Sequence, residues 1–147
     1  QNGNAETYRF PGTQIEGLDY SFSGIKTAVM YFLRDALKSD PGFIRSNLDD
    51  ICASVQHTLV QMLMEKLVIA AEQFEIDHIA IAGGVSANSG LRQEMQRQAA
   101  ARNWQVFIPE FEYCTDNAAM IAITAHYKYL KGEFAGLDVS PDSRLGH

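Results

Sequence analysis

In several stretches of this chain the apolar positions recur every three or four residues. Residues 25–37 carry such a stripe, which predicts a helix that ends at the turn residues 39–42. Residues 46–74 show a longer helical pattern, and residues 59–71 within it are apolar around most of the girth. Because a helix of that kind is buried between other elements, we expect it to be the central packing helix.

Polar positions define the start and the solvent side of this long helix. Ser46 precedes it, and Asp49 and Asp50 fall in its expected first turn, where the helix dipole favours acidic groups. The expected solvent side is spaced by whole turns and consists of Asp50, Ser54, Thr58, Gln61, Glu65 and Glu72.

Two short runs between helical patterns predict strands. Residues 79–82 alternate isoleucine with alanine, which suits a strand covered on both faces. Residues 104–109 form a second run, which is stopped by its closing proline. Helices are expected at residues 87–103, on the surface, and at residues 116–130. Helices alternating with strands indicate an α/β fold.

The remaining segments carry turn or loop signals. Residues 1–19 are polar and punctuated by glycine and proline, and residues 20–24 resemble a short extended piece. We expect a loop at residues 110–115. The polar tail, residues 141–147, is expected to lie over the surface.

Size and composition place few restrictions on function. The chain has 147 residues, enough for one domain or a piece of one, and its 46% hydrophobic and 20% charged residues are typical of a soluble globular protein. No apolar run approaches the roughly 18 residues of a membrane span. The start lacks the basic and apolar regions of a signal peptide and has no Met, so we expect a fragment without membrane attachment.

Charge and cysteine content bear on the binding partners of the chain and on its cellular compartment. The formal charge of −6 argues against this segment gripping nucleic acid by itself, because phosphate binding needs clustered basic residues. Cys52 and Cys114 are far apart and belong to no C-x-x-C pair. The simplest interpretation is a reduced cytoplasmic compartment, with both thiols buried as small apolar groups.

The most informative stretch is residues 78–88, where a strand is followed by Gly83 and Gly84 and then by a helix start. Glycines let the backbone approach a ligand closely, and helix N-termini favour negative charge. Ser86 and Asn88 add short polar side chains at this mouth. The same pattern also fits a plain tight turn followed by a helix cap, and the residues alone leave both interpretations open.

Three blocks in order carry a family resemblance. They are residues 19–28 (DYSFSGIKTA), 83–88 (GGVSAN) and 114–122 (CTDNAAMIA), and the closing residues 136–141 and 144–146 fit as well. Together they closely resemble the C-terminal half of the tRNA threonylcarbamoyladenosine transferases, a family that long carried the name O-sialoglycoprotein endopeptidase. Three ordered blocks are far more specific than any one of them.

The resemblance implies an α/β fold: the C-terminal lobe of an actin-like, sugar-kinase-like protein, helix-rich with a small sheet. It implies a single lobe over residues 1–147, with the N-terminal lobe absent. Such enzymes transfer a threonylcarbamoyl group from threonylcarbamoyl-AMP to the adenosine beside the anticodon of tRNA. They act with partner proteins of the same pathway and hold one divalent metal ion, iron or zinc, in the nucleotide cleft.

The resemblance also assigns roles to individual residues. Asp116 matches the metal-ligating Asp of the T-D-N block, and Asn88 matches an Asn that contacts the nucleotide, with Gly83 and Gly84 beside it. An oxygen ligand and an amide suit these tasks chemically. The alternative for Asp116 and for Asn88 is a helix cap, which is compatible with the ligand role. The start of the first block, with Ser21, Ser23 and Lys26, either lines the cleft or, through Ser23, caps the first helix.

The chain departs from the family in one respect. The metal-ligating histidines of the family come from an H-x-x-x-H helix in the N-terminal half, and the four histidines here form no such pair. We therefore expect an incomplete site, no certain catalytic residue and an inactive fragment. Other interpretations are a non-catalytic nucleotide-cleft or partner-binding module, a metallopeptidase without the expected H-E-x-x-H motif, and a sugar kinase.

Overall fold

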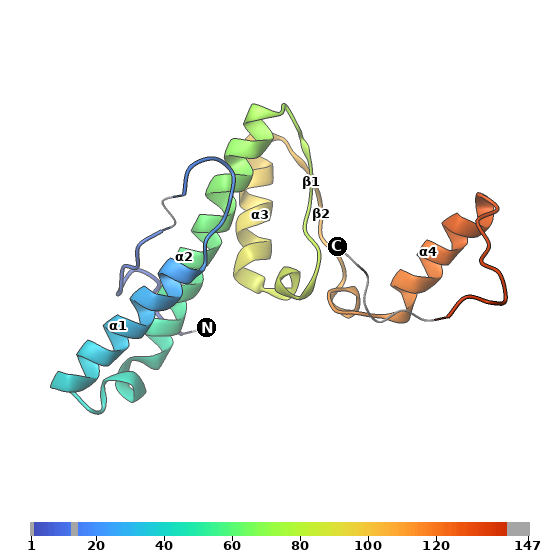
Figure 1. Cartoon of the computed structure of the whole chain (residues 1–147). Coiled ribbons are helices and arrows are strands. Elements are labelled where there is room, and N and C mark those ends of the chain that lie inside the picture. Colours follow the sequence, from blue (N-terminus) through green and yellow to red (C-terminus); the bar gives the residue numbers. More distant parts are fainter. Residues whose placement is uncertain (1, 13–14, 141–147) are drawn as a thin grey trace.

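The computed structural model describes residues 2–12 and 15–140 of the chain. The predicted surface position of the tail, residues 141–147, lies outside these ranges. The elements follow in the order α1 (Ser23–Ser39), α2 (Phe43–Gln73), β1 (His78–Ala80), α3 (Ser89–Arg102), β2 (Gln105–Phe107) and α4 (Ala118–Leu130). Two 3₁₀ turns, η1 (Gly84–Ala87) and η2 (Phe111–Tyr113), precede α3 and α4 (Figure 1).

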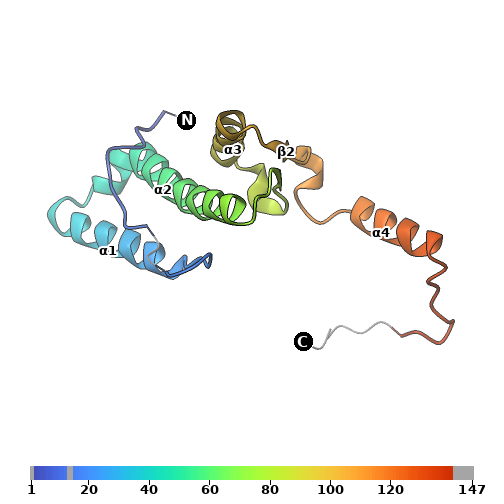
Figure 2. The same cartoon turned by 90° about the horizontal axis from the view of Figure 1, so that it is seen from above.

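Helix α2 lies between α1 and α3, which confirms the central packing helix. Figures 1 and 2 show α1 and α2 as a helical hairpin, α3 along the other side of α2, and the two strands beyond α3. Helix α4 stands apart from this body in both views. The described residues therefore form a helix-rich α/β arrangement with a small sheet, as predicted.

The start of α2 differs from the prediction. The helix begins at Phe43 after Gly42, so Ser46 is not its cap, and Asp49 and Asp50 lie beyond its first turn. Asn47 has non-helical angles (φ −122°, ψ 16°), and its side-chain amide donates to the Phe43 carbonyl at 2.8 Å. The helical pattern beginning at residue 46 thus marks the part of α2 that follows a kink. An Asn side chain that binds the backbone in this way competes with regular helix geometry.

Ser54 was expected on the solvent side of α2, and this prediction is wrong. The residue is fully buried, because the N-terminal segment crosses this part of the helix. The backbone N–H of Tyr8 donates to Ser54 Oγ at 3.2 Å, and Asp50 Oδ1 accepts the Asn4 N–H at 2.8 Å. The helical spacing places this serine on the solvent side of α2, but a segment that is remote in the sequence covers it.

Helix α1 begins earlier than the sequence indicated. Ser23 and Gly24 were expected in an extended piece but form the first residues of the helix, and Phe22 occupies the N-cap position. Ser23 is therefore not the cap. Rings from the N-terminal segment, α1 and the start of α2 pack together, with Tyr8 and Phe32 centroids 5.0 Å apart and Phe32 and Phe43 centroids 5.8 Å apart. These contacts hold the hairpin closed.

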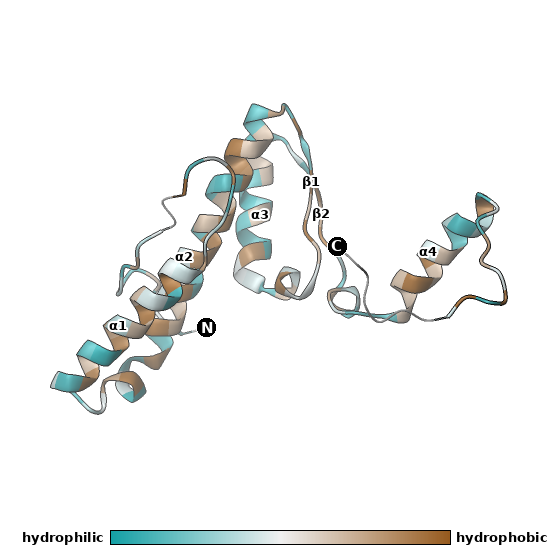
Figure 3. Cartoon of the chain, viewed as in Figure 1, coloured by the Kyte–Doolittle hydropathy of each residue, from teal (hydrophilic) through white to brown (hydrophobic). Residues whose placement is uncertain are grey.

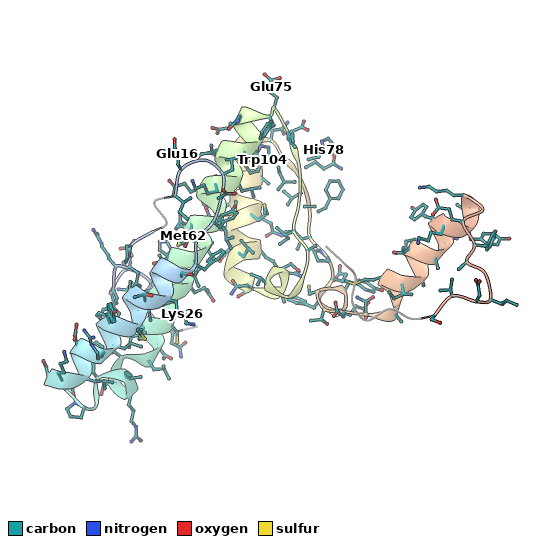
Figure 4. All side chains as sticks on the ribbon, in the orientation of Figure 1. Glu16, Lys26, Met62, Glu75, His78 and Trp104 are labelled. Atoms are coloured by element: carbon teal, nitrogen blue, oxygen red, sulfur yellow. The ribbon has the colours of Figure 1, made fainter. Side chains whose placement is uncertain are left out.

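Strands β1 and β2 pair in parallel through α3, with Ile79 opposite Val106. Parallel neighbours need such a crossover. One face of the sheet packs on the core formed by α2 and α3, where Ile79 is buried. The other face exposes His78 and Phe107, whose rings stack with centroids 6.2 Å apart, and Figure 4 shows His78 on the side away from α3. The expectation of a strand covered on both faces is thus wrong.

The core lies between α2, α3 and the sheet. Its buried members are Val60, Met64, Ala71, Ile79, Leu91 and Met95. Trp104 packs against them near the junction of α2, α3 and the strands (Figure 4). Helix α3 begins at Ser89, two residues later than predicted, and its apolar side faces α2 while most other positions face solvent. The prediction of a surface helix holds for that outer side.

Helix α4 spans the predicted segment but starts at Ala118. Every residue of α4 is exposed, including Ile121 and Leu130, and Figure 3 shows apolar colouring over the first turns of the helix. Gly132, with φ +71°, follows its last residues and gives the expected stop. Within the described ranges, we find no helix with the length and apolar character needed to cross a membrane.

Candidate functional site

Strand β1 leads into the glycine loop, which we define as residues 83–88. Gly83 has φ +79° and ψ 177°, a conformation that only glycine adopts readily. The Ser86 N–H donates to the Gly83 carbonyl at 2.9 Å and so closes a tight turn. A Cβ built on Gly83 or Gly84 would meet no atom of the described chain within 4 Å. The predicted close approach to the backbone is therefore sterically open at both glycines.

Ser86 does not present its hydroxyl to this open space, contrary to the prediction. The residue is buried, and Ser86 Oγ donates to the Gly83 carbonyl at 2.6 Å. Its side chain thus reinforces the turn from inside.

Asn88 is the N-cap of α3, as one of the two interpretations held. Asn88 Oδ1 accepts the Leu91 N–H at 3.0 Å, and Asn88 Nδ2 donates to Gln56 Oε1 of α2 at 3.2 Å. Gly90 permits this close approach, because a Cβ there would lie 2.7 Å from Gln56 Nε2. The structure assigns Asn88 a local role, and its nucleotide contact stays a prediction.

The second part of the site is the carboxylate loop, which we define as residues 109–117. Asp116 is exposed near its end, and within residues 2–12 and 15–140 its side chain has no hydrogen-bond or ion-pair partner. Asn117 caps α4 instead, since its Oδ1 accepts the Met120 N–H at 3.2 Å and its Nδ2 donates to the Thr115 carbonyl at 2.8 Å. Asp116 is therefore not the cap of this helix, which was the alternative to its ligand role, and its carboxylate is left available.

Arg92 joins the two loops. Its Nε donates to the Ser86 carbonyl and its Nη2 to the Pro109 carbonyl, both at 2.6 Å. Nη2 also lies 3.2 Å from Cys114 Sγ, and the guanidinium carbon lies 4.0 Å from the Phe111 ring centre. The sequence carried no signal for this role of Arg92, because its acceptors belong to other segments of the chain.

The two cysteines have opposite surroundings. Cys114 is fully buried, as predicted, and its thiol donates to the Glu110 carbonyl at 3.4 Å. Cys52 is exposed on α2, so the prediction that both thiols are buried is wrong for this residue. Helical spacing alone did not reveal that the side of α2 that carries Cys52 faces solvent.

Acidic groups dominate the surface of the carboxylate loop. Glu110 and Glu112 are exposed and precede Asp116 by a few residues. A hydrogen bond with Glu112, together with the negative charge nearby, raises the pKa of the exposed Tyr113 hydroxyl. The guanidinium of Arg92 brings positive charge to the inner side of this loop.

The donor set fits a metal ion only in part. A carboxylate without a partner is a suitable oxygen ligand for a divalent cation. In the described part of the chain, no group of three or more His, Cys, Asp and Glu residues is placed to hold one. Asp116 therefore fits the role of a single ligand in a site that needs further ligands.

An apolar groove of about 340 Å³ lies between α2 and the glycine loop. Asn88 and Gln56 stand at its polar side. The apolar lining includes Ile51, Val55, Leu59, Leu63, Val85 and Leu91. A concave apolar surface with a few polar groups is the usual form of a small-molecule site.

Lys26 lies in the first turn of α1, which packs on the side of α2 away from α3 (Figures 2 and 4), and Ser21 precedes this helix in the chain. The glycine loop and the carboxylate loop, by contrast, are brought together by Arg92 on α3. The structure therefore brings together the second block (residues 83–88) and the third block (residues 114–122). It does not bring the first block (residues 19–28) to them.

The described residues define a helix-rich α/β protein built around one strand, glycine loop, helix and strand unit. Residues 1–123 match the family model of tRNA N6-adenosine threonylcarbamoyltransferase. The chain belongs to this family.

Curated relatives with that name include proteins of Cytophaga hutchinsonii and Porphyromonas gingivalis. The first is 54% identical over 145 residues, which are 99% of this chain and 42% of the relative. The second is 52% identical over 143 residues, 97% of this chain and 42% of the relative. A relative from Riemerella anatipestifer is 52% identical over 144 residues, 98% of this chain and 42% of the relative. The chain thus spans about two fifths of the length of these relatives.

Proposed function

We propose that this chain is the nucleotide-binding C-terminal lobe of a tRNA-modifying transferase. The complete protein would transfer a threonylcarbamoyl group from threonylcarbamoyl-AMP to the adenosine beside the anticodon. The observation that carries the proposal is the pairing of an open glycine loop with the unpartnered Asp116 carboxylate, in a chain of this family. The segment alone is expected to be inactive.

The glycine loop supports a nucleotide site. Gly83 and Gly84 leave room for a phosphate or ribose against the backbone, and the loop leads into the N-terminus of α3, which favours negative charge. The apolar groove beside Asn88 suits a flat base. The Asn88 amide has a second N–H group and a second acceptor position besides those used in the cap and in the bond to Gln56, and these would contact the nucleotide.

Asp116 supports a role toward a metal. It would be one ligand of a divalent ion, iron or zinc, whose other ligands come from outside the described residues. When bound, the ion would supply positive charge that orients the mixed anhydride of the donor and stabilises the negative charge that develops on it during transfer. Asp116 would contribute its carboxylate oxygen as a ligand, at the end of a loop that hydrogen bonds hold in place.

The partners follow from the reaction. tRNA would be the acceptor and would bind through the whole assembly, because the charge of −6 makes this segment a poor grip for phosphates. Pathway partner proteins and an N-terminal lobe would complete the site. A cytoplasmic location agrees with a tRNA substrate.

The direct test is a transfer assay on the full gene product that contains this chain. Wild type should modify an unmodified tRNA transcript in the presence of threonylcarbamoyl-AMP, and Asp116→Ala should lose this activity. The matched control is Asp49→Ala, because Asp49 is an exposed carboxylate on α2 outside both loops. An inactive wild type would contradict the proposed reaction, and an active Asp116→Ala would contradict the ligand role.

A second candidate is a non-catalytic module whose exposed face docks on a protein surface, here a second copy of this chain. The exposed apolar helix α4, where Ile121 is 74% exposed, favours it. Light scattering of the chain over a range of concentrations would test this function. Association that Ile121→Lys abolishes would support docking through α4, and a monomer at every concentration would contradict self-association.

A further inference from the structure

Arg92 contacts both candidate loops from one place. It lies in the first turn of α3, directly after the glycine loop. Its guanidinium donates to the last part of that loop at the Ser86 carbonyl and to the first residue of the carboxylate loop at the Pro109 carbonyl. Because each N–H has its own acceptor, the distance between the two backbones is set by the width of one rigid planar group.

The same guanidinium also holds the interior of the carboxylate loop. It stacks on the Phe111 ring at 4.0 Å and donates to the sulfur of Cys114, two residues before Asp116. Cys114 is fully buried under this arrangement. On the other side of Asp116, Asn117 is held by its two hydrogen bonds at the start of α4. Asp116 is therefore exposed between two anchored neighbours.

Arginine is specifically suited to this position. Two carbonyl acceptors and a thiol are reached through two different nitrogens, while the flat face covers an aromatic ring. A lysine would present a single ammonium and no planar face, so it would hold fewer of these contacts. Within the described ranges, Arg92 takes part in no ion pair with a carboxylate, so its bonds to the loops are the contacts that orient it.

We propose that Arg92 is a positioning residue: it fixes the carboxylate loop against the glycine loop, so that Asp116 keeps a constant place relative to the bound nucleotide. This inference rests on the proposed function, because the reaction needs both loops in one site. Small displacements of such groups are expected to affect the chemical step more than substrate binding.

The test uses Arg92→Met and Arg92→Lys in the full gene product, with Arg97→Met as the matched control. Arg97 lies on the same helix, but its side chain is 63% exposed and pairs with Glu94. The first measurement is the rate at which N-ethylmaleimide labels Cys114, read by peptide mass spectrometry. Cys52 is the exposed reference thiol in the same sample. The second is kcat and KM of tRNA modification.

In Arg92→Met, we expect labelling of Cys114 to accelerate by about tenfold or more while Cys52 is unchanged. We expect kcat to fall by about tenfold to a hundredfold with little change in the KM for tRNA. Arg92→Lys should lie between Met and wild type in both measurements. Arg97→Met should match wild type in both.

Two results would overturn the role of Arg92 in an active wild type. One is a Cys114 that stays protected in both Arg92 variants, and the other is an unchanged kcat when Cys114 has become reactive. If Arg92→Met does not fold, Arg92→Lys carries the test, and wild-type kinetics in that variant would overturn the proposal. An inactive wild type would instead overturn the proposed reaction, and the labelling rates would still decide whether Arg92 anchors the loop.

Discussion

Asn88 and Gln56 form a hydrogen bond between the start of α3 and the middle of α2, with Nδ2 and Oε1 3.2 Å apart. The same Asn88 side chain caps α3 through the Leu91 N–H. The residue that the family resemblance assigns to the nucleotide thus also stabilises the fold. Variants of Asn88 must therefore be chosen so that an effect on stability can be told from an effect on nucleotide binding.

For Asn88, the separating variants are Ala and Asp. Asn88→Ala loses the cap and should lower the free energy of unfolding by about 1 kcal/mol. Asn88→Asp keeps a cap oxygen but loses the amide donor, so its stability should stay closer to wild type. Both should bind AMP more weakly, as measured by calorimetry, because neither has the amide donor. Wild-type AMP affinity in Asn88→Asp would argue against a ligand role of the amide.

The two loop glycines should behave differently. Gly83 has φ +79°, so Gly83→Ala should cost about 1–3 kcal/mol through backbone strain. Gly84 lacks a positive φ and faces open space, so Gly84→Ala should change the free energy of unfolding by less than about 0.5 kcal/mol. We expect Gly84→Ala to reduce AMP affinity, because its methyl group would occupy the ligand space. Thermal unfolding and calorimetry measure the two effects, and normal AMP binding would show that the ligand does not approach Gly84.

Met95 should be among the costly core positions. It is completely buried among α2, α3 and the sheet, so Met95→Ala should lower the free energy of unfolding by about 2–5 kcal/mol. The matched control is Met30→Ala on α1, where the side chain is 55% exposed and the expected change is below about 0.5 kcal/mol. Urea unfolding of both variants measures the difference, and equal losses would contradict the described core.

Asp35 on α1 provides a pH prediction. Hydrogen bonds from Arg34 and then Lys38 lower the pKa of this carboxyl from 3.8 to about 2. Because the folded-state pKa is the lower one, the favourable interaction is present above about pH 4 and is lost as the pH falls through about 2. Carboxyl NMR titration should therefore give a midpoint near 2.

The double variant Arg34→Gln with Lys38→Gln is the control for Asp35. It removes both donors, so the pKa should return toward 3.8. Added salt should also raise the pKa of Asp35 toward 3.8, because the charges of Asp35, Arg34 and Lys38 are exposed and are therefore screened. A wild-type midpoint at 3.8 would mean that the side chains do not hold this arrangement in solution.

The sequence indicated where helices and strands lie more accurately than where they begin. Helical spacing of Val29, Phe32 and Leu33 identified α1, and the isoleucines 79 and 81 identified β1. The boundaries shifted at Ser46 and at residues 20–24, because Asn47 bends the backbone and because Ser23 and Gly24 join a helix that starts early. The local conformational preferences that set where a helix begins are small in free energy compared with the packing of its side chains.

The candidate site was predicted in its parts. The three sequence blocks identified Gly83, Gly84, Asn88 and Asp116 by the resemblance, and the structure keeps the glycines open and the Asp116 carboxylate exposed. The connection through Arg92 was not predicted. Its acceptors belong to segments that only α3 and the parallel pairing of β1 with β2 bring within reach.

By itself, the sequence determined the α/β element order, the central helix and the family, because these depend on periodicity and on residues near one another in the chain. Only the tertiary structure decided which faces are covered. Ser54 is buried because Asn4 and Tyr8 cross it, one face of the sheet is exposed, and Cys52 faces solvent while Cys114 lies under Arg92. The physical reason is that burial depends on contacts between remote segments, which a local pattern of polar and apolar residues does not encode.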